Sequence, residues 1–308
     1  MTSLIHPLWL YLFIDIFEWG AFGNGFAASV TNILNFVGLY CLTWYKAHKG
    51  TFIKINTDSI KGWSEFMAVA VPSCLMICLE TWNYQITAIM TGYLEDKNQI
   101  NANVIILNIS LFFYMFPFGL SVANSNIVGK FVGRNSIKGT ELSCKLSILY
   151  TLIWSILINS LLAIFRPLLP YIYTSDEKLV PVVDNLILIY VFYEFFDFLT
   201  TSYAGMFRGL GMQNIISIAN LICFYVISIP LCYVLTYPAK LGIYGNWISY
   251  VIAIVCLVTS YTIIYLKKVD FQKICHESQS RLSRDSIAIS DEQSLKSVSY
   301  EKSEVMNI

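Results

Sequence analysis

WSEFMAVAVPSCLMICLETWNYQITAIMTG, residues 63–92, is the stretch of sequence that decides the fold. It is apolar for longer than the roughly 20 helical residues that cross a hydrocarbon core of ~30 Å. Glu80 lies in the middle of the stretch. A carboxylate at that depth costs about 2.5–3.5 kcal/mol on insertion scales, so it normally faces a bundle interior or a water-filled cavity. We expect a membrane-spanning helix in which Glu80 is either functional or held by hydrogen bonds within the bundle.

The composition of the whole chain also predicts an integral membrane protein. Of its 308 residues, 56% are hydrophobic and only 13% are charged. Soluble domains carry about 25% charged residues, so the expected surroundings are a lipid bilayer. The 20 basic and 20 acidic residues give zero net charge. No basic surface is available to release counterions, which argues against a nucleic-acid partner.

Motifs of enzymes and cofactor-binding proteins are missing from the sequence. There is no G-x-x-x-x-G-K-[ST] loop to support ATP-driven pumping. The three histidines, His6, His48 and His276, are scattered, and the eight cysteines include no C-x-x-C pair. Neither a metal site nor a disulfide framework is therefore indicated. We expect no enzyme activity, no catalytic residues, no cofactor and no bound metal.

Apolar segments divide the chain into about eight transmembrane helices. The predicted spans are 8–22, 24–45, 63–92, 102–125, 142–165, 179–206, 214–236 and 243–266. The first is weak because it is short and contains Asp15 and Glu18. The remainder, 268–308, is polar and serine-rich and is predicted to be a disordered tail. The fold class is therefore an all-α, polytopic integral membrane protein.

Basic residues in the loops predict the orientation in a plasma or organelle membrane. Alternate loops, beginning with 46–62, hold Lys46, Lys49, Lys54, Lys61, Lys130, Arg134, Lys138, Arg208, Lys267, Lys268 and Lys273. The opposite loops hold only Lys97, Arg166, Lys178 and Lys240. Because lysine and arginine accumulate on the cytoplasmic side, the bias places the C-terminus in the cytoplasm.

Two more carboxylates fall inside the predicted span 179–206. Glu194 and Asp197 are three residues apart, which places them on one face of a helix. Two carboxylates on one buried face cannot both ionise cheaply, so at least one is expected to bind and release a proton during a transport cycle. Glu194 has a second interpretation, as the partner of a basic or hydroxyl group.

Aromatic and amide side chains inside the spans are candidates for a substrate cavity. They are Trp82, Tyr84, Gln85, Asn108, Tyr114, Asn124 and Tyr193. The aromatic rings suit a flat organic cation, whereas the alternative for most of them is packing or contact with lipid. The amides have the alternative of bonding between helices.

Five stretches resemble motifs of the eukaryotic MATE (multidrug and toxic compound extrusion) transporters, in family order. They are AVPSCLMICLETWNYQITAIMTGYL (70–94), YMFPFGLSVANSNIVGKFVGRN (114–135), FRGLGMQ (207–213) with Ile229-Pro230 beyond it, LGIYGNWIS (241–249) and, more loosely, GAFGNGFAASVTN (20–32). The spacing is compatible with the family throughout, so the resemblance covers most of the chain.

The resemblance implies helices arranged in two six-helix lobes, and export of organic cations, xenobiotics or metabolites in exchange for H⁺ or Na⁺. It also places the family's seventh-helix glutamate at Glu80 and its tenth-helix acidic residue at Asp197, whereas Glu194 has no assigned counterpart. The loop after PFGLS departs from the family, because Ile127, Lys130 and Phe131 replace its usual Arg, Asn and acidic residue.

Aligned to the family, Met1 falls near the fifth helix. We therefore expect residues 1–45 to be the last two helices of a truncated N-terminal lobe, 46–267 to be a complete six-helix lobe, and 268–308 to be a cytoplasmic tail. One lobe cannot form the cleft between lobes that alternating access requires. One alternative is therefore a non-transporting subunit whose homologous partner supplies the missing lobe. A second is a related flippase of lipid-linked substrates, because that superfamily shares the architecture.

Overall fold

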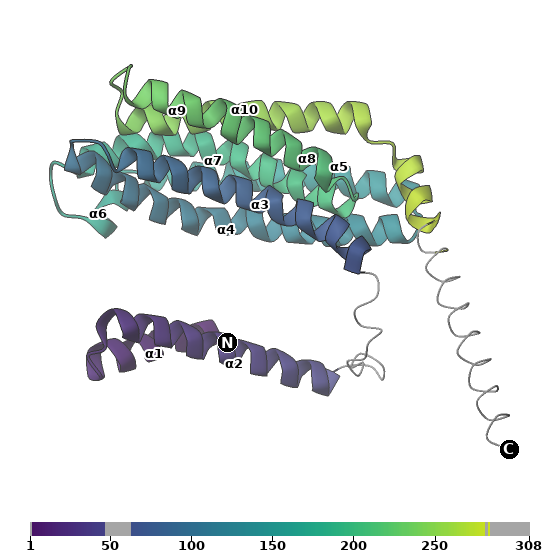
Figure 1. The fold of residues 1–308 in the computed structure, drawn as a ribbon, viewed down its shortest axis with the longest axis horizontal. Coiled ribbons are helices and arrows are strands. Elements are labelled where there is room, and N and C mark those ends of the chain that lie inside the picture. Colours follow the sequence, from purple (N-terminus) through teal and green to yellow (C-terminus); the bar gives the residue numbers. More distant parts are fainter. Residues whose placement is uncertain (1, 47–62, 281–282, 284–308) are drawn as a thin grey trace. The chain divides into compact units, whose positions relative to one another are not determined.

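Helices make up all the regular secondary structure in the part of the chain that the computed structural model describes, residues 2–46, 63–280 and 283 (Figure 1). The chain divides into two compact units, Met1–Trp63 and Ser64–Ile308.

The first unit is a helical hairpin. It consists of α1 (Thr2–Leu10), the π-helix η1 (Tyr11–Ile16) and α2 (Gly20–Lys46). A 2.8 Å hydrogen bond between His6 Nδ1 and Thr31 Oγ1 joins α1 to α2. The chain reverses between Ile16 and Gly20, where Glu18 and Gly20 have positive φ angles of 55° and 53°. The predicted span 8–22 is therefore wrong in its bounds, because this turn ends the first apolar helix.

The second unit contains the remaining helices. They are α3 (Trp63–Thr91), α4 (Lys97–Gly133), α5 (Ile137–Phe165), α6 (Leu169–Tyr173), α7 (Val180–Gly209), α8 (Gln213–Asn220), the π-helix η3 (Leu221–Ser228), α9 (Ile229–Thr236) and α10 (Ile243–Lys268). The segments α8, η3 and α9 follow one another without a break and act as one spanning element.

Six helical segments in the described residues are long and apolar enough to cross a membrane. They are Gly20–Lys46, Phe66–Thr91, Lys97–Gly133, Ile137–Phe165, Gln213–Thr236 and Ile243–Lys268. Helix α7 is not in this set although it has 30 residues. With α7 and the shorter apolar helix Ile5–Ile16, the described part of the chain contains eight apolar helices, and the predicted fold class is confirmed.

Helix α7 lies in the middle of the second unit and packs against α4, α5 and α10 (Figure 1). Two glycines bring α4 and α7 close together. A Cβ atom on Gly205 would collide with the carbonyl oxygen of Ser121, and one on Gly209 would lie 2.8 Å from the carbonyl oxygen of Ser125. This close approach places the carboxylates of α7 inside the bundle.

The element α8–η3–α9 holds α3 through bonds to its main chain. Ser217 Oγ donates to the Pro72 carbonyl at 2.8 Å, and Asn220 Nδ2 donates to the Met76 carbonyl at 3.1 Å. The π-helix η3 ends directly before Ile229 and Pro230. A proline has no N–H to continue the α-helical bonding pattern, which gives a local reason for the wider winding there.

An ion pair joins the end of α5 to the start of α7. Arg166 Nε donates to Asp184 Oδ1 at 2.7 Å, and Nη2 bonds the other carboxylate oxygen. The hydrogen bond to Asp184 raises the pKa of the Arg166 guanidinium above its ordinary value. Both side chains are about a quarter exposed, so the pair serves mainly to fix this corner of the bundle.

The polar segment after α10 differs in part from its prediction. Residues 271–280, within the segment expected to be disordered, form a helix. Cys275 is fully buried there, with its sulfur 3.6 Å from Thr140 Oγ1, and Gln279 Nε2 donates to the Gly133 carbonyl at 2.9 Å. Apolar contacts and hydrogen bonds to α4 and α5 order this stretch. Residues 281–308, apart from Ser283, lie outside the described residues.

Candidate functional site

Two cavities in the second unit bring most of the candidate residues together. The larger, here called the carboxylate cavity, holds about 1030 Å³ including its opening. Its polar lining consists of Glu80, Thr81, Tyr84, Gln85, Ser110, Tyr114, Tyr190, Tyr193, Glu194 and Asp197. The smaller, the arginine cavity, holds about 420 Å³ including its opening. Its polar lining consists of Glu80, Tyr114, Ser121, Thr200, Thr201, Arg208, Asn220 and Tyr261.

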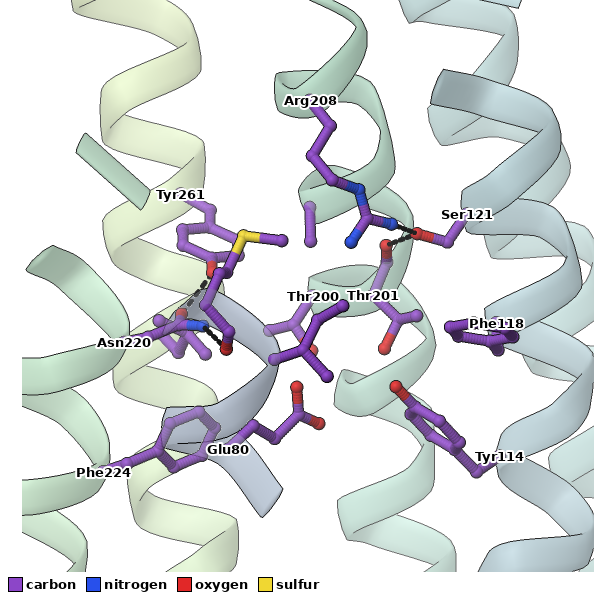
Figure 2. A pocket seen from close by; sticks show the side chains of 14 residues that line it. Glu80, Tyr114, Phe118, Ser121, Thr200, Thr201, Arg208, Asn220, Phe224 and Tyr261 are labelled. Atoms are coloured by element: carbon purple, nitrogen blue, oxygen red, sulfur yellow. Dashed lines mark hydrogen bonds between the residues drawn. The ribbon is translucent and has the colours of Figure 1, made fainter. Parts of the chain in front are cut away.

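Glu80 is common to both cavities and comes from the middle of α3. Figure 2 shows its carboxylate and the Tyr114 hydroxyl directed into the arginine cavity, with Arg208 at the far end. The side chain is half-buried. A carboxylate in this position can interact with an occupant of either cavity.

Asp197 lies on α7 and is held by hydroxyl groups. It is only 2% exposed, and the Tyr193 hydroxyl donates to Asp197 Oδ1 at 3.3 Å. Thr200 Oγ1 lies 3.4 Å from the same oxygen. The Tyr193 hydroxyl in turn bonds the Tyr84 hydroxyl on α3. A chain of hydroxyls therefore leads from α3 to Asp197.

Glu194 is the most deeply buried of the three carboxylates, at 1% exposure. The Tyr190 hydroxyl donates to its Oε2 at 2.5 Å, so the predicted alternative of a hydroxyl partner is realised for this oxygen. Its Oε1 has no hydrogen-bond partner among the residues that the structure describes. Glu194 thus lines the carboxylate cavity with one carboxylate oxygen hydrogen-bonded and the other without a partner among the described residues.

Arg208 is the main residue that the sequence analysis placed wrongly. It was counted as a loop charge, whereas it lies in the last turn of α7, half-buried, and lines the arginine cavity. Its Nη2 donates to Ser121 Oγ at 2.8 Å, and Ser121 Oγ donates to the Thr201 carbonyl at 2.6 Å (Figure 2). Eleven residues are about three helical turns, so the spacing from Asp197 to Arg208 already places both on one face.

Seven of the ten predicted site residues line the carboxylate cavity, and three line neither cavity. The seven are Glu80, Tyr84, Gln85, Tyr114, Tyr193, Glu194 and Asp197. Trp82 is 52% exposed on the outer face of α3. Asn108 is exposed and bonds the Val104 carbonyl in its own helix at 2.8 Å. Asn124 is buried and donates to Ser202 Oγ at 2.8 Å, so it bonds between helices.

The tyrosine Tyr190, which the sequence analysis did not select, also belongs to the site. It precedes Glu194 by four residues, and this i,i+4 spacing places the two side chains on one helical face. That spacing was the available signal. Tyr190 is fully buried and packs edge-on against Trp247, with ring centroids 5.8 Å apart.

The lining of the carboxylate cavity suits a cation. It contains three carboxylates and no lysine, arginine or histidine. Tyrosine rings attract cations through their faces. Within the described residues, no three acidic, histidine or cysteine side chains are grouped closely enough to hold a metal ion. The arrangement suits protons, monovalent cations or organic cations.

Comparisons with known proteins place these observations in a family. The sequence matches the MatE family over residues 72–234. The multidrug and toxin extrusion protein 1 of Rattus norvegicus is 30% identical over 280 residues, which are 90% of this chain and 49% of the relative. The Homo sapiens protein of the same name is 27% identical over 280 residues, with the same coverage. The chain thus spans about half the length of the curated relatives it matches.

Solved structures show the same fold. The eukaryotic MATE transporter AtDTX14 matches with a TM-score of 0.86 and 23% identity, over 91% of this chain and 63% of that one. An outward-facing multidrug resistance MATE transporter of the MOP superfamily matches with a TM-score of 0.75 and 15% identity, over 89% and 61%. The resemblance expected from the sequence motifs is confirmed.

Proposed function

Because the chain belongs to the MatE family of transporters, we propose that it forms the cation-handling part of a secondary antiporter. This antiporter exports organic cations, xenobiotics or metabolites in exchange for protons or sodium ions. The observation that carries the proposal is the carboxylate cavity, where Glu80 on α3 and Asp197 on α7 line one space.

The exchange follows from competition for negative charge. A buried carboxylate is costly unless it is protonated or paired with a cation. When an organic cation enters, its charge pairs with the carboxylates and displaces the proton or sodium ion held there. Tyr193 and Thr200 position Asp197, and Tyr84 extends the hydroxyl chain toward α3.

Alternating access needs a second lobe, and this is also part of the proposal. The second unit supplies one set of spanning helices, whereas the curated relatives are about twice as long as the chain. We propose that a homologous lobe completes the central cleft. A lining that is acidic and lacks basic residues favours cations over the anionic phosphates of lipid-linked sugars, so the flippase alternative is less well supported.

The test replaces both coupling acids by their amides, Glu80→Gln with Asp197→Asn. The purified chain is reconstituted in liposomes together with a transport-disabled MATE relative that supplies the second lobe, and uptake of a radiolabelled quaternary ammonium ion is followed under an outward proton or sodium gradient. We expect exchange to fall at least tenfold, because the amides neither carry charge nor exchange protons.

The matched control is Asp176→Asn with Glu177→Gln, which makes the same two changes in the exposed loop before α7. It should transport like the unmodified chain. Undiminished exchange by the cavity variant would refute the proposed role of the two acids. No exchange by the intact chain, alone or with a transport-disabled MATE relative as partner, would refute the antiporter itself.

A further inference from the structure

The cavity contains one acid more than the exchange of a single cation requires. Glu80 and Asp197 account for the proposed coupling, whereas Glu194 lines the same space and has no role in it. We propose that Glu194 binds a second positive charge on the substrate, so that the carboxylate cavity selects organic dications over monocations. This inference rests on the proposed function and specifies its substrate class.

One oxygen of the Glu194 carboxylate lacks a hydrogen-bond partner. The side chain is 99% buried, and Tyr190 satisfies only Oε2. Oε1 has no partner among the described residues. A buried polar atom without a partner costs about 1–3 kcal/mol, and more if it is charged. Glu194 lines the carboxylate cavity, so a cationic group bound there is the candidate partner for this side chain.

The carboxylate cavity has no basic side chain in its lining to balance the acids. Arg208, the cation near Glu80, lines the arginine cavity and bonds Ser121. Glu194 is therefore either protonated or paired with positive charge that enters with the ligand.

The three acids of the carboxylate cavity come from two different helices. Glu194 and Asp197 project from one face of α7, with Cβ atoms about 5–6 Å apart for this spacing, while Glu80 projects from α3. Within the described residues they do not form a metal-binding group. Acids that reach one cavity from two helices match a molecule with two cationic groups better than one compact ion, and the adjacent tyrosine rings suit quaternary ammonium groups.

The experiment compares two ligands that differ by one charge. Hexamethonium carries a trimethylammonium group at each end of a six-carbon chain, whereas hexyltrimethylammonium carries only one. Binding of each is measured on the purified full-length chain in lipid nanodiscs. We expect the unmodified chain to bind hexamethonium at least tenfold more tightly.

The variant Glu194→Gln should reduce this preference to less than threefold, with the Kd of hexyltrimethylammonium unchanged within twofold. Glu177→Gln, the same change at an exposed loop position, should keep the full preference. An equal loss for both ligands would show a general structural role for Glu194, and an unchanged preference would show no role. Either result overturns the proposal.

A second variant covers the case in which Glu194→Gln does not fold. Glu194→Asp keeps the charge but shortens the side chain by one methylene. Across a series of bis-trimethylammonium compounds of increasing spacer length, the best-bound member should shift to a longer spacer. A purely structural carboxylate would not move this optimum. Because binding is measured without a gradient, loss of transport alone would refute the proposed antiport and leave this result intact.

Discussion

Ser121 connects a charged side chain to a contact between two helices. Its hydroxyl accepts from Arg208 Nη2 at 2.8 Å and donates to the Thr201 carbonyl at 2.6 Å. The residue is fully buried in α4. One hydroxyl therefore fixes both the guanidinium in the arginine cavity and the position of α4 against α7.

We predict that Ser121→Ala lowers the free energy of unfolding by about 1–3 kcal/mol, because a partly buried charged donor and a buried carbonyl both lose their partner. Ser110→Ala makes the same change in the same helix, where the hydroxyl bonds only the Leu107 carbonyl one turn away. It should cost less than about 0.5 kcal/mol. Denaturant unfolding in detergent micelles measures both, and equal costs would contradict the assigned role of Ser121.

Residue chemistry explains which site residues were predictable. Glu80 and Asp197 were identified because a carboxylate in a long apolar run is costly wherever the helix packs. Arg208 lies at the end of an apolar segment. Hydropathy alone cannot tell whether an arginine at such an end lies in a loop or points into the helix bundle. Trp82 and Asn124 failed as cavity residues for the same reason, since the direction in which a side chain points depends on how its helix is rotated in the bundle.

At the scale of elements, the contact between α4 and α7 determines where the carboxylates lie. Gly205 allows the two backbones to approach until no Cβ fits beside the Ser121 carbonyl. Small residues have this role in membrane helices, because packing there is driven by close contact and not by exclusion of water.

Gly205→Ala should destabilise the protein by about 1–3 kcal/mol, as overpacking does in other cores. The gain of up to about 1 kcal/mol in helix propensity does not offset a clash with main-chain atoms. Gly119→Ala is the matched control, because nothing lies within 4 Å of a Cβ at that position of α4. Thermal unfolding followed by tryptophan fluorescence distinguishes them, and a neutral Gly205→Ala would disprove the close contact.

The number and order of the long apolar helices were predictable, whereas their lengths were not. The predicted span 102–125 covers only part of α4, which runs from Lys97 to Gly133. At ~1.5 Å per residue its 37 residues reach about 55 Å, well beyond a hydrocarbon core of ~30 Å. Hydropathy predicts only the apolar part of a helix, whereas the helical hydrogen bonds of α4 extend beyond that part at both ends. Asp96 caps the start by accepting from the Asn98 N–H at 2.9 Å.

At the scale of the whole molecule, the excess of basic residues in alternate loops leads us to propose that the α4–α5 turn faces the cytoplasm and the α6–α7 loop faces the opposite side. Lys130, Arg134 and Lys138 surround the first, and Lys178 is in the second. Both connections belong to the second unit, so one pair of probes reports its orientation.

The prediction uses single cysteines in a background without the native ones. Ile137→Cys and Ser175→Cys replace exposed residues in these two regions. In sealed cells, a membrane-impermeant maleimide should label Ser175→Cys and leave Ile137→Cys unlabelled until the membrane is permeabilised. The reverse pattern would show that the chain is inserted in the other direction.

The position of Glu80 has a consequence for the way the two cavities are occupied. The Glu80 carboxylate lines both the carboxylate cavity, with Glu194 and Asp197, and the arginine cavity, with Arg208. When Glu80 pairs with a cation in the carboxylate cavity, Arg208 loses a neighbouring negative charge. When Glu80 pairs with Arg208, the cation in the carboxylate cavity loses one of its carboxylates. We therefore expect a ligand in the carboxylate cavity and Arg208 in the arginine cavity to compete for the Glu80 carboxylate.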